Sequence, residues 1–313
     1  MELKPDTRIS CLGDYLKVIE KLKESYPISH FYGNPAQTHF LYRGISDQRY
    51  LLLPSVFRIQ EDILQADVDS PQSVIENDMY LTYGSEKQIL CSFIREASNY
   101  LSLRPDQWLQ WAEYAQHYGT PTRFLDWSSN PLVALYFACR DKKETDGKVW
   151  LLHHSNYMRL AKSKFPQNLQ NRTIQDIASD IINGLIQTTP ENPQSGYPIL
   201  YTPYYIDTRM SAQSSWFMLW IEEKTPLETM IEKAKYQMDD IIENQPVKLC
   251  VVKKEPSLWH RFLIEAHQKQ SILRELDTVG INEKTLFPGL DGIGRYVEKK
   301  YHFDYAEATN HYL

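Results

Sequence analysis

Cysteine is sparse in this sequence of 313 residues, and its four cysteines lie far apart. None belongs to a Cys-x-x-Cys pair, so the chain has neither the spacing of a structural zinc site nor a disulfide framework. Cys139 and Cys250 lie within apolar runs, where a thiol packs as a small hydrophobe. We therefore interpret these two cysteines as packing residues.

The common catalytic and phosphate-binding motifs are also missing. His-Glu-x-x-His does not occur, and no histidine shares a supported ligand spacing with another histidine or cysteine, so we expect no metal site. The P-loop and the Gly-x-Gly-x-x-Gly fingerprint are absent. Gly-x-Ser-x-Gly is absent too, which argues against the nucleophile elbow of α/β-hydrolases.

Long apolar runs and an excess of basic residues are the other absences. No window approaches about 18 uncharged apolar residues, and the first six residues contain no apolar signal core. The net charge is −6, from 34 basic and 40 acidic residues, so the chain has no global basic field for nucleic acid, although a local basic patch is compatible with it. We expect a soluble, cytoplasmic protein with no membrane partner and no strong nucleic-acid signature.

The residues that are present predict a packed α+β fold, because 42% are hydrophobic and 12% aromatic. Helical and strand-like periodicities alternate along the chain. The expected helices are 9–26, 85–103, 106–118, 174–186, 226–243, 257–267, 268–278 and 292–300, and one begins at Pro131. The expected strands are 39–44, 123–127, 147–153, 204–206, 216–220 and 247–252.

One polar stretch, 116–131, is unusually rich in hydrogen-bonding side chains for a connection between two apolar helices. Gly119 is placed to end the first helix, and Pro131 is at the favoured first position of the second, with Ser128, Ser129 or Asn130 as its cap. These roles do not account for the remaining polar side chains, so we interpret the stretch as the wall of a site. Those side chains are His117, Tyr118, Thr122, Arg123 and Asp126.

Two other segments carry polar residues at strand edges: Arg43, and the turn expected at 209–213. Guanidinium groups bind phosphate or carboxylate, hydroxyls and amides suit ribose, and tyrosine suits a flat ring. The combined set predicts a cleft for a nucleotide-like ligand. We assign catalytic roles to Arg43, Asp126 and Gln213, and ligand-binding roles to His117, Tyr118, Thr122, Arg123, Ser128, Ser129, Asn130 and Arg209.

Purely structural roles for the arginines remain open. Arg43 could be an exposed arginine at a strand end. Arg123 or Arg43 could instead form a structural ion pair with Asp126 that locks the turn.

Several blocks of the sequence resemble the FRG domain family. They are Phe40-Leu41-Tyr42-Arg43-Gly44, the run 115–138 with His117-Tyr118-Gly119-Thr120-Pro121-Thr122-Arg123, the segment 209–217, and the C-terminal stretches 272–281 and 285–292. The resemblance spans roughly residues 35–300, with an insertion near 155–200. It leaves an N-terminal helical segment, 1–34, and a C-terminal tail, 301–313.

The order of these blocks is also similar to the layout of ADP-ribosyltransferases. That similarity implies a central split or mixed β-sheet with flanking helices and a cleft for NAD. It places the NAD-contacting arginine on Arg43 and the nicotinamide pocket on Ser128 or Ser129. The late glutamate of those enzymes would fall in 209–213, where Gln213 offers only a neutral amide, which cannot stabilise positive charge as a carboxylate does.

The resemblance implies an NAD-consuming ADP-ribosyltransferase or NAD glycohydrolase, acting as a bacterial toxin or phage-defence effector. Asp126 or another acid would then replace the missing glutamate, or the protein would bind NAD-like ligands without this reaction. The alternative is a non-catalytic module in which Arg43, Arg123 and Gln213 recognise a phosphate, a nucleic-acid end or a protein partner. The sequence does not indicate a macromolecular target.

Overall fold

The computed structural model describes residues 6–25, 40–58, 83–163, 172–187, 196–204, 207–221, 225–231 and 259–310. The strands are β1 (Asp6–Ile9), β2 (Phe40–Ile45), β3 (Phe124–Ser128), β4 (Gly147–His153), β5 (Ile199–Tyr201), β6 (Ser215–Leu219) and β7 (Trp259–Ile264). The α-helices are α1 (Leu12–Ser25), α4 (Tyr83–Ala97), α5 (Trp108–His117), α6 (Pro131–Arg140), α7 (His154–Ser163), α8 (Ile174–Gln187), α9 (Thr208–Ala212), α11 (Lys269–Thr278), α12 (Glu283–Leu286) and α13 (Leu290–Asn310). Two short 3₁₀ helices are η2 (Ser55–Phe57) and η4 (Ala266–Gln268).

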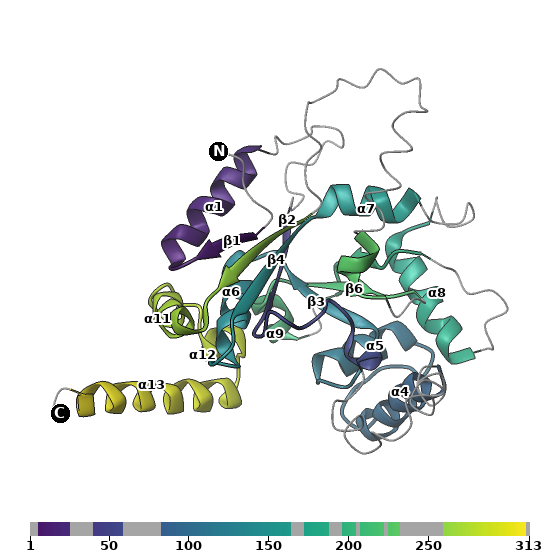
Figure 1. The fold of residues 1–313 in the computed structure, drawn as a ribbon. Helices are drawn as coiled ribbons and strands as arrows, with labels where there is room; N and C mark the ends of the chain where they lie inside the picture. The colour runs from purple at the N-terminus through teal and green to yellow at the C-terminus, as the bar shows by residue number, and fades with distance from the viewer. Residues whose placement is uncertain are drawn as a thin grey trace, which may run out of the picture.

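The strands form one seven-stranded mixed sheet in the order β1-β7-β4-β2-β3-β6-β5 (Figure 1). β1 runs parallel to β7, and the other neighbours are antiparallel. This arrangement, with helices on both faces, confirms the predicted α+β class and mixed sheet.

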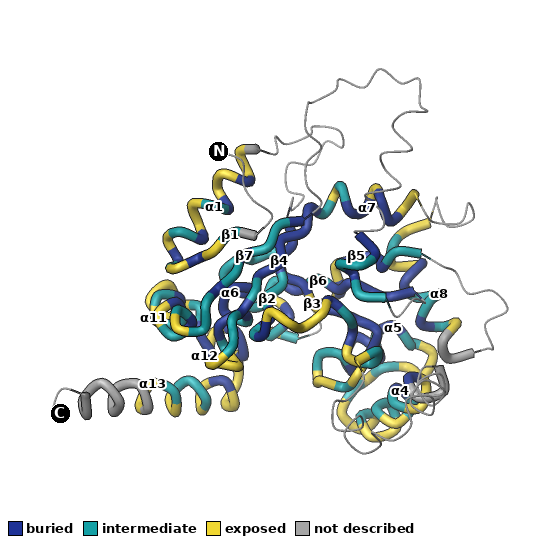
Figure 2. The backbone as a smooth tube through the Cα atoms, in the orientation of Figure 1, coloured by how far each residue is buried: buried dark blue, intermediate teal, exposed yellow. Residues whose placement is uncertain are grey.

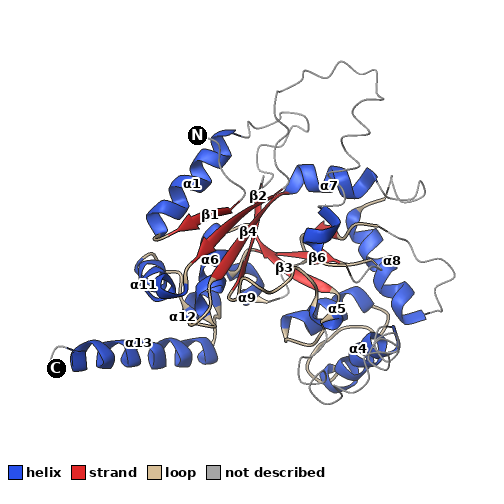
Figure 3. Ribbon diagram, in the orientation of Figure 1, coloured by secondary structure: helices blue, strands red, loops and turns tan. Residues whose placement is uncertain are grey.

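The sheet is nearly divided between β2 and β3. In the described part of the chain these two strands pair only at Tyr42 and Ser128, whereas β2 and β4 pair along the whole of β2. Figure 3 shows β3 and β6 running in a different direction from β4 and β2. The near-division produces two half-sheets, β1-β7-β4-β2 and β3-β6-β5, which splay apart beyond one point of contact.

Apolar side chains on both faces of the sheet form the core, seen as buried backbone along the strands in Figure 2. β4 illustrates the two-residue period: Val149 packs with α1, α6 and α11, and Trp150 packs on the opposite face with Tyr157 of α7. A third cluster joins α4, α5 and α8 to the second half-sheet. The first and third clusters thus cover one half-sheet each, whereas the cluster that contains Trp150 and Tyr157 spans both half-sheets.

The turn that joins β3 to α6 follows the local chemistry of the sequence. The Oδ1 atom of Asn130 accepts a hydrogen bond from the amide of Leu132 at 2.9 Å, and Pro131 occupies the first helical position. Gly119 has a positive φ of 81° just past Tyr118, the C-cap of α5, where a left-handed backbone favours glycine. These observations confirm the predicted cap and the predicted helix end.

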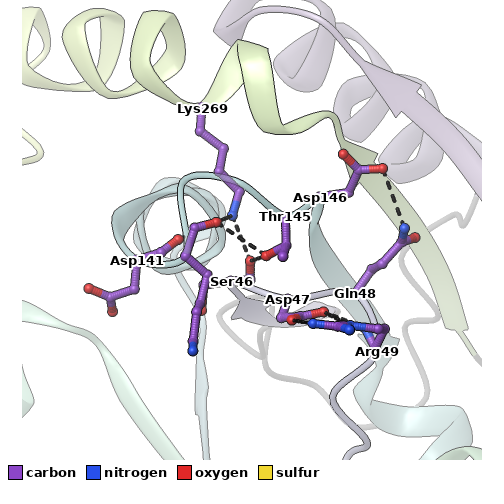
Figure 4. Close-up of polar contacts among 9 residues, drawn as sticks. Ser46, Asp47, Gln48, Arg49, Asp141, Thr145, Asp146 and Lys269 are labelled. Atoms are coloured by element: carbon purple, nitrogen blue, oxygen red, sulfur yellow. Dashed lines mark hydrogen bonds and ion pairs between the residues drawn. The ribbon is translucent and has the colours of Figure 1, made fainter.

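A buried lysine binds two connections of the chain through three backbone carbonyls (Figure 4). Lys269, at the start of α11, is 1% exposed, and its Nζ donates to the carbonyl oxygens of Ser46, Asp141 and Lys142 at 2.6, 3.1 and 2.9 Å. The ammonium thus joins the end of β2 to the connection between α6 and β4. Its three donors are all used in the described structure.

Several sequence-based assignments were wrong. Residues 257–267 were expected to be helical, but Trp259–Ile264 forms β7, which is paired with β1 on one side and β4 on the other. The expected turn at 209–213 is largely the short helix α9, capped by Asp207. Tyr204 is not in a strand, because the strand in this region is Ile199–Tyr201.

Other expectations fall partly or wholly outside the described residues. Residues 227–231 are helical, as expected, but the rest of the predicted helix 226–243 and the predicted strand 247–252 lie outside the described ranges. Over the ranges that are described, no helix has the length and apolar character needed to cross a membrane.

Candidate functional site

A cleft of about 200 Å³ opens where the two half-sheets splay apart. Its walls come from β2, β3 and β6 and from helices α5, α6 and α9. The lining residues with polar side chains are Tyr42, Arg43, Gln116, His117, Asp126, Ser128, Arg209, Gln213 and Ser215. Segments that are distant in sequence therefore meet at the one place where β2 and β3 lose their pairing.

The cleft gathers part of the predicted set and leaves part of it elsewhere. The predicted site residues that line it are Arg43, His117, Asp126, Ser128, Arg209 and Gln213. The predicted residues that do not line it are Tyr118, Thr122, Arg123, Ser129 and Asn130.

Arg43 bridges the point at which the half-sheets separate. Its Nη1 donates to the backbone carbonyl of Asp126, so the guanidinium takes up an acceptor on β3 at the place where ladder pairing with β2 ceases. Its Nε atom is buried and has no hydrogen-bond partner in the described structure. Burial lowers the pKa of Arg43 to about 10, against the field of Asp126, which raises it. The Arg43 side chain as a whole is half-buried and lines the cleft, so its guanidinium can meet an anionic ligand there.

Asp126 supplies the only carboxylate among the described residues that line the cleft. Its Oδ2 accepts a hydrogen bond from Nε2 of Gln116 at 2.8 Å, and Oε1 of Gln116 accepts one from the hydroxyl of Thr122. Thr122 thereby orients Asp126 through Gln116. The carboxylate itself is exposed and makes no ion pair with Arg43 or Arg123.

Ser128 and Gln213 hold the wall of the cleft together. The Ser128 hydroxyl donates to the Gln213 carbonyl at 2.7 Å and accepts from the amide of Asn130 at 3.0 Å. The side-chain amide of Gln213 donates to the carbonyl of Leu286 at 3.0 Å. These bonds tie α9 to the end of β3 and to α12, so both side chains position the site.

His117 and Arg209 complete the polar lining. His117 Nε2 lies 3.5 Å from Oδ1 of Asp207, and burial lowers the pKa of the imidazole against the field of this carboxylate. The Arg209 guanidinium lies over the ring of Phe287, 4.6 Å from its centroid. Burial lowers the pKa of Arg209 as well, and Asp126 acts in the opposite direction.

Arg123 lies away from the cleft, in a buried ion pair with Glu86. Its Nε and Nη2 atoms lie 2.9 and 2.7 Å from the two carboxylate oxygens, and Nη1 donates to the carbonyl of Ile221 at 2.6 Å. Both side chains are about 5% exposed or less. Arg123 thus has the structural role that was one of its open alternatives, with Glu86 in place of Asp126 as its partner.

The other predicted residues outside the cleft have local roles. Tyr118 is exposed and stacks on Tyr114, with a centroid separation of 6.5 Å. Asn130 caps α6, and the amide of Ser129 donates to the carbonyl of Ser214 at 3.1 Å.

Sequence reasoning missed several lining residues, chiefly Tyr42, Gln116, Ser215 and Phe137. Tyr42 has a buried hydroxyl with no hydrogen-bond partner in the described structure, and burial raises its pKa. Its position next to Arg43 in the Tyr-Arg-Gly run was the available signal. Gln116 directly precedes His117 at a helix end and could have been found in the same way.

Among the residues the structure describes, no group of three or more histidine, cysteine, aspartate or glutamate side chains is arranged to hold a metal ion. The polar atoms at the cleft are guanidinium, imidazole, amide and hydroxyl groups around one carboxylate. That composition is suited to an anionic, hydrogen-bonding ligand.

The fold and the cleft define a mixed α/β protein with an arginine-containing site between two half-sheets. Residues 38–147 match the FRG domain family, as the Tyr42-Arg43-Gly44 run and the block at 115–138 predicted. The match contains Arg43, His117, Asp126 and Ser128, whereas α9 follows it in the sequence. Comparison with curated proteins and with solved structures gave no match.

Proposed function

We propose that the cleft binds NAD and cleaves its N-glycosidic bond, transferring ADP-ribose to water or to a macromolecule. The observation that carries the proposal is the placement of Arg43, a half-buried arginine that lines the cleft together with the carboxylate of Asp126. Guanidinium groups bind phosphate through several parallel donors. An arginine for phosphate and a carboxylate for the ribose are the two charges that NAD cleavage needs.

Asp126 is the residue to which we assign charge stabilisation. Cleavage breaks the bond between ribose C1′ and the nicotinamide nitrogen, and the electron pair leaves with nicotinamide. The ribose then carries positive charge, which an oriented carboxylate stabilises, until a water or a hydroxyl adds at C1′ and loses a proton. The hydrogen bond from Gln116 fixes the orientation of the Asp126 carboxylate before the reaction.

Gln213 has a positioning role in this proposal. Its side-chain amide donates to the Leu286 carbonyl, and its backbone carbonyl accepts from the Ser128 hydroxyl. The side chain that stands where the related layout has a glutamate therefore supports the wall of the cleft. An NAD-consuming activity of this kind, in the cytoplasm, would suit a bacterial toxin or phage-defence effector.

The test is nicotinamide release from NAD, followed by chromatography. We expect turnover by the wild type and a loss of about 100-fold or more in Asp126→Asn, as for the removal of one oriented group that stabilises a transition-state charge. Glu20→Gln is the matched control, because Glu20 is an exposed carboxylate on α1, far from the cleft lining. Thermal melts of each variant separate loss of activity from loss of fold.

The occupied amide of Gln213 is also the observation that favours a second candidate, a non-catalytic binding module. In that case the wild type binds NAD or ADP-ribose without releasing nicotinamide, and Arg43→Gln abolishes binding while Asp126→Asn does not. This outcome would overturn the catalytic proposal and keep the nucleotide-binding cleft.

A further inference from the structure

A cluster of arginines surrounds one aromatic ring beside the cleft. The guanidinium carbons of Arg209, Arg140 and Arg295 lie 4.6, 4.7 and 5.2 Å from the centroid of Phe287. Phe287 follows α12 and is 6% exposed. The three cations therefore lie within about 10 Å of one another, on the order of the Debye length in physiological salt, so they act as one local field.

Arg209 belongs to both the cleft and this cluster. It lines the cleft from α9, and the same guanidinium covers the Phe287 ring. Phe137, another lining residue, packs edge-on against Phe287 with centroids 6.1 Å apart. The arginine cluster is thus continuous with the cleft through these contacts.

The ion-paired cations of this region outnumber the carboxylates that pair with them. Arg140, Arg295 and Lys299 all share the buried carboxylate of Glu283, at 3.2, 3.4 and 2.6 Å, and Arg140 also lies 3.8 Å from the carboxylate of Asp141. Arg209 has no ion pair in the described structure, although the fields of Asp126 and Asp207 reach it. Two carboxylates do not neutralise three paired cations, so these groups keep a net positive charge that attracts an anion.

The excess is notable because the whole chain has a net charge of −6. Gathering like charges is unfavourable unless a ring, a carboxylate or a ligand compensates. Phe287 and Glu283 offset part of this repulsion. The side chains of Arg295 and Lys299 are 41% and 44% exposed, so an anion can approach the cluster from solvent.

The size of the cleft also indicates that part of the ligand lies at its rim. Its volume of about 200 Å³ is below the roughly 300–1,000 Å³ of sites that enclose a complete drug-sized ligand. A dinucleotide would place only one of its ends inside the cleft. One phosphate would lie in the cleft beside Arg43, and the second would lie at the rim, where Arg209 meets the cluster.

We propose that Arg209, Arg140 and Arg295 form a diphosphate-binding position at the rim of the cleft, so that its ligands carry a diphosphate group. This inference rests on the proposed nucleotide site and makes it more specific. The diphosphate could belong to a nucleoside diphosphate or to a dinucleotide such as NAD, and the group recognised is the same. Arg43 binds the part of the ligand inside the cleft, and the cluster selects for the second phosphate.

Calorimetric titration of the full chain with AMP, ADP and inorganic pyrophosphate tests the proposal. We expect ADP to bind at least about tenfold more tightly than AMP, and Arg295→Gln to remove most of that difference while AMP affinity changes less than about twofold, because a charge-assisted hydrogen bond contributes on the order of a tenfold change in affinity. Lys300→Gln is the control, since Lys300 is an exposed cation on the same helix that makes no contact with Phe287 or Glu283.

The outcomes separate this inference from the proposed function. Equal affinities for AMP and ADP, or an equal loss of both in Arg295→Gln, would overturn the diphosphate position and leave the nucleotide cleft intact. Pyrophosphate binding that is lost in Arg295→Gln, with neither nucleotide bound, would keep the diphosphate position and refute the nucleotide cleft. Thermal melts of Arg295→Gln and Lys300→Gln show whether each variant is folded.

Discussion

Glu113, on α5, is a buried carboxylic acid with no ion pair in the described structure. It is 2% exposed, Oε1 accepts a hydrogen bond from the hydroxyl of Tyr201 at 3.0 Å, and Oε2 has no partner in the described structure. Burial raises the pKa of Glu113 to about 7, and the Tyr201 hydrogen bond lowers it by a smaller amount. We predict that this one carboxyl makes the protein less stable as the pH rises toward neutrality.

The direction in which the free energy of unfolding changes with pH follows from proton binding. Between the ordinary pKa of 4.5 and the folded value of about 7, the unfolded chain has lost the Glu113 proton and the folded chain retains it, so the free energy of unfolding falls as pH increases. Above about pH 7 the destabilisation is complete. At about 1.4 kcal/mol for each unit of pKa, the full effect is on the order of 3 kcal/mol.

Glu113→Gln tests this effect with little change in shape. The amide keeps an acceptor for Tyr201 but cannot ionise. The free energy of unfolding of the variant, relative to the wild type, should therefore increase by up to about 3 kcal/mol between pH 4.5 and pH 8. Urea denaturation at several pH values measures the difference. His117 and His260, whose pKa values burial lowers, titrate in both proteins, so subtraction isolates Glu113.

The control is Glu96→Gln, an exposed carboxylate on the neighbouring helix α4. Its stability relative to the wild type should not vary over this pH range. A constant difference between Glu113→Gln and the wild type from pH 4.5 to pH 8 would refute the reasoning, because it would mean that Glu113 does not titrate near neutrality in the folded protein.

Three further variants test the packing around the site. Lys269→Met should lose about 3 kcal/mol in urea denaturation, because three backbone carbonyls lose their donor; an unchanged midpoint would contradict this. Gly44→Ala should prevent normal folding, seen as a loss of soluble protein, because its Cβ would lie 1.8 Å from a carbonyl oxygen of α6, whereas Gly184→Ala in an open helical position should be tolerated. Arg123→Met should cost about 3–5 kcal/mol by stranding Glu86, and a double variant with Glu86→Leu should recover much of this loss; equal stabilities of the single and double variants would argue against a buried pair.

Several helix ends and strands could be predicted from local sequence chemistry. The end of α5 at Gly119 and the start of α6 at Asn130 and Pro131 follow from backbone preferences that act within a few residues. β4 was also predictable from its apolar, β-branched and aromatic run. Sequence patterns of this kind need no knowledge of distant partners.

β7 shows where such reasoning fails. Trp259–Ile264 lies in a segment whose spacing favoured a helix, yet pairing with β1 and β4 makes it an inner strand of the sheet. The hydrogen bonds that decide this come from residues more than 100 positions away in the chain. Tertiary pairing therefore overrides a weak local preference.

Arg43 and Arg123 show what the sequence determined and what only the structure decided. By itself the sequence determined the FRG domain, the mixed α/β class and the polar segments around Arg43 and Asp126. It could not separate Arg43 from Arg123, because both are arginines in or beside a short strand. Only the tertiary structure decided that Arg123 is neutralised by Glu86 inside the core, whereas Arg43 lies at the splayed junction of β2 and β3 with a donor left over. The physical reason is that the partner of a buried charge is set by the packing of distant elements.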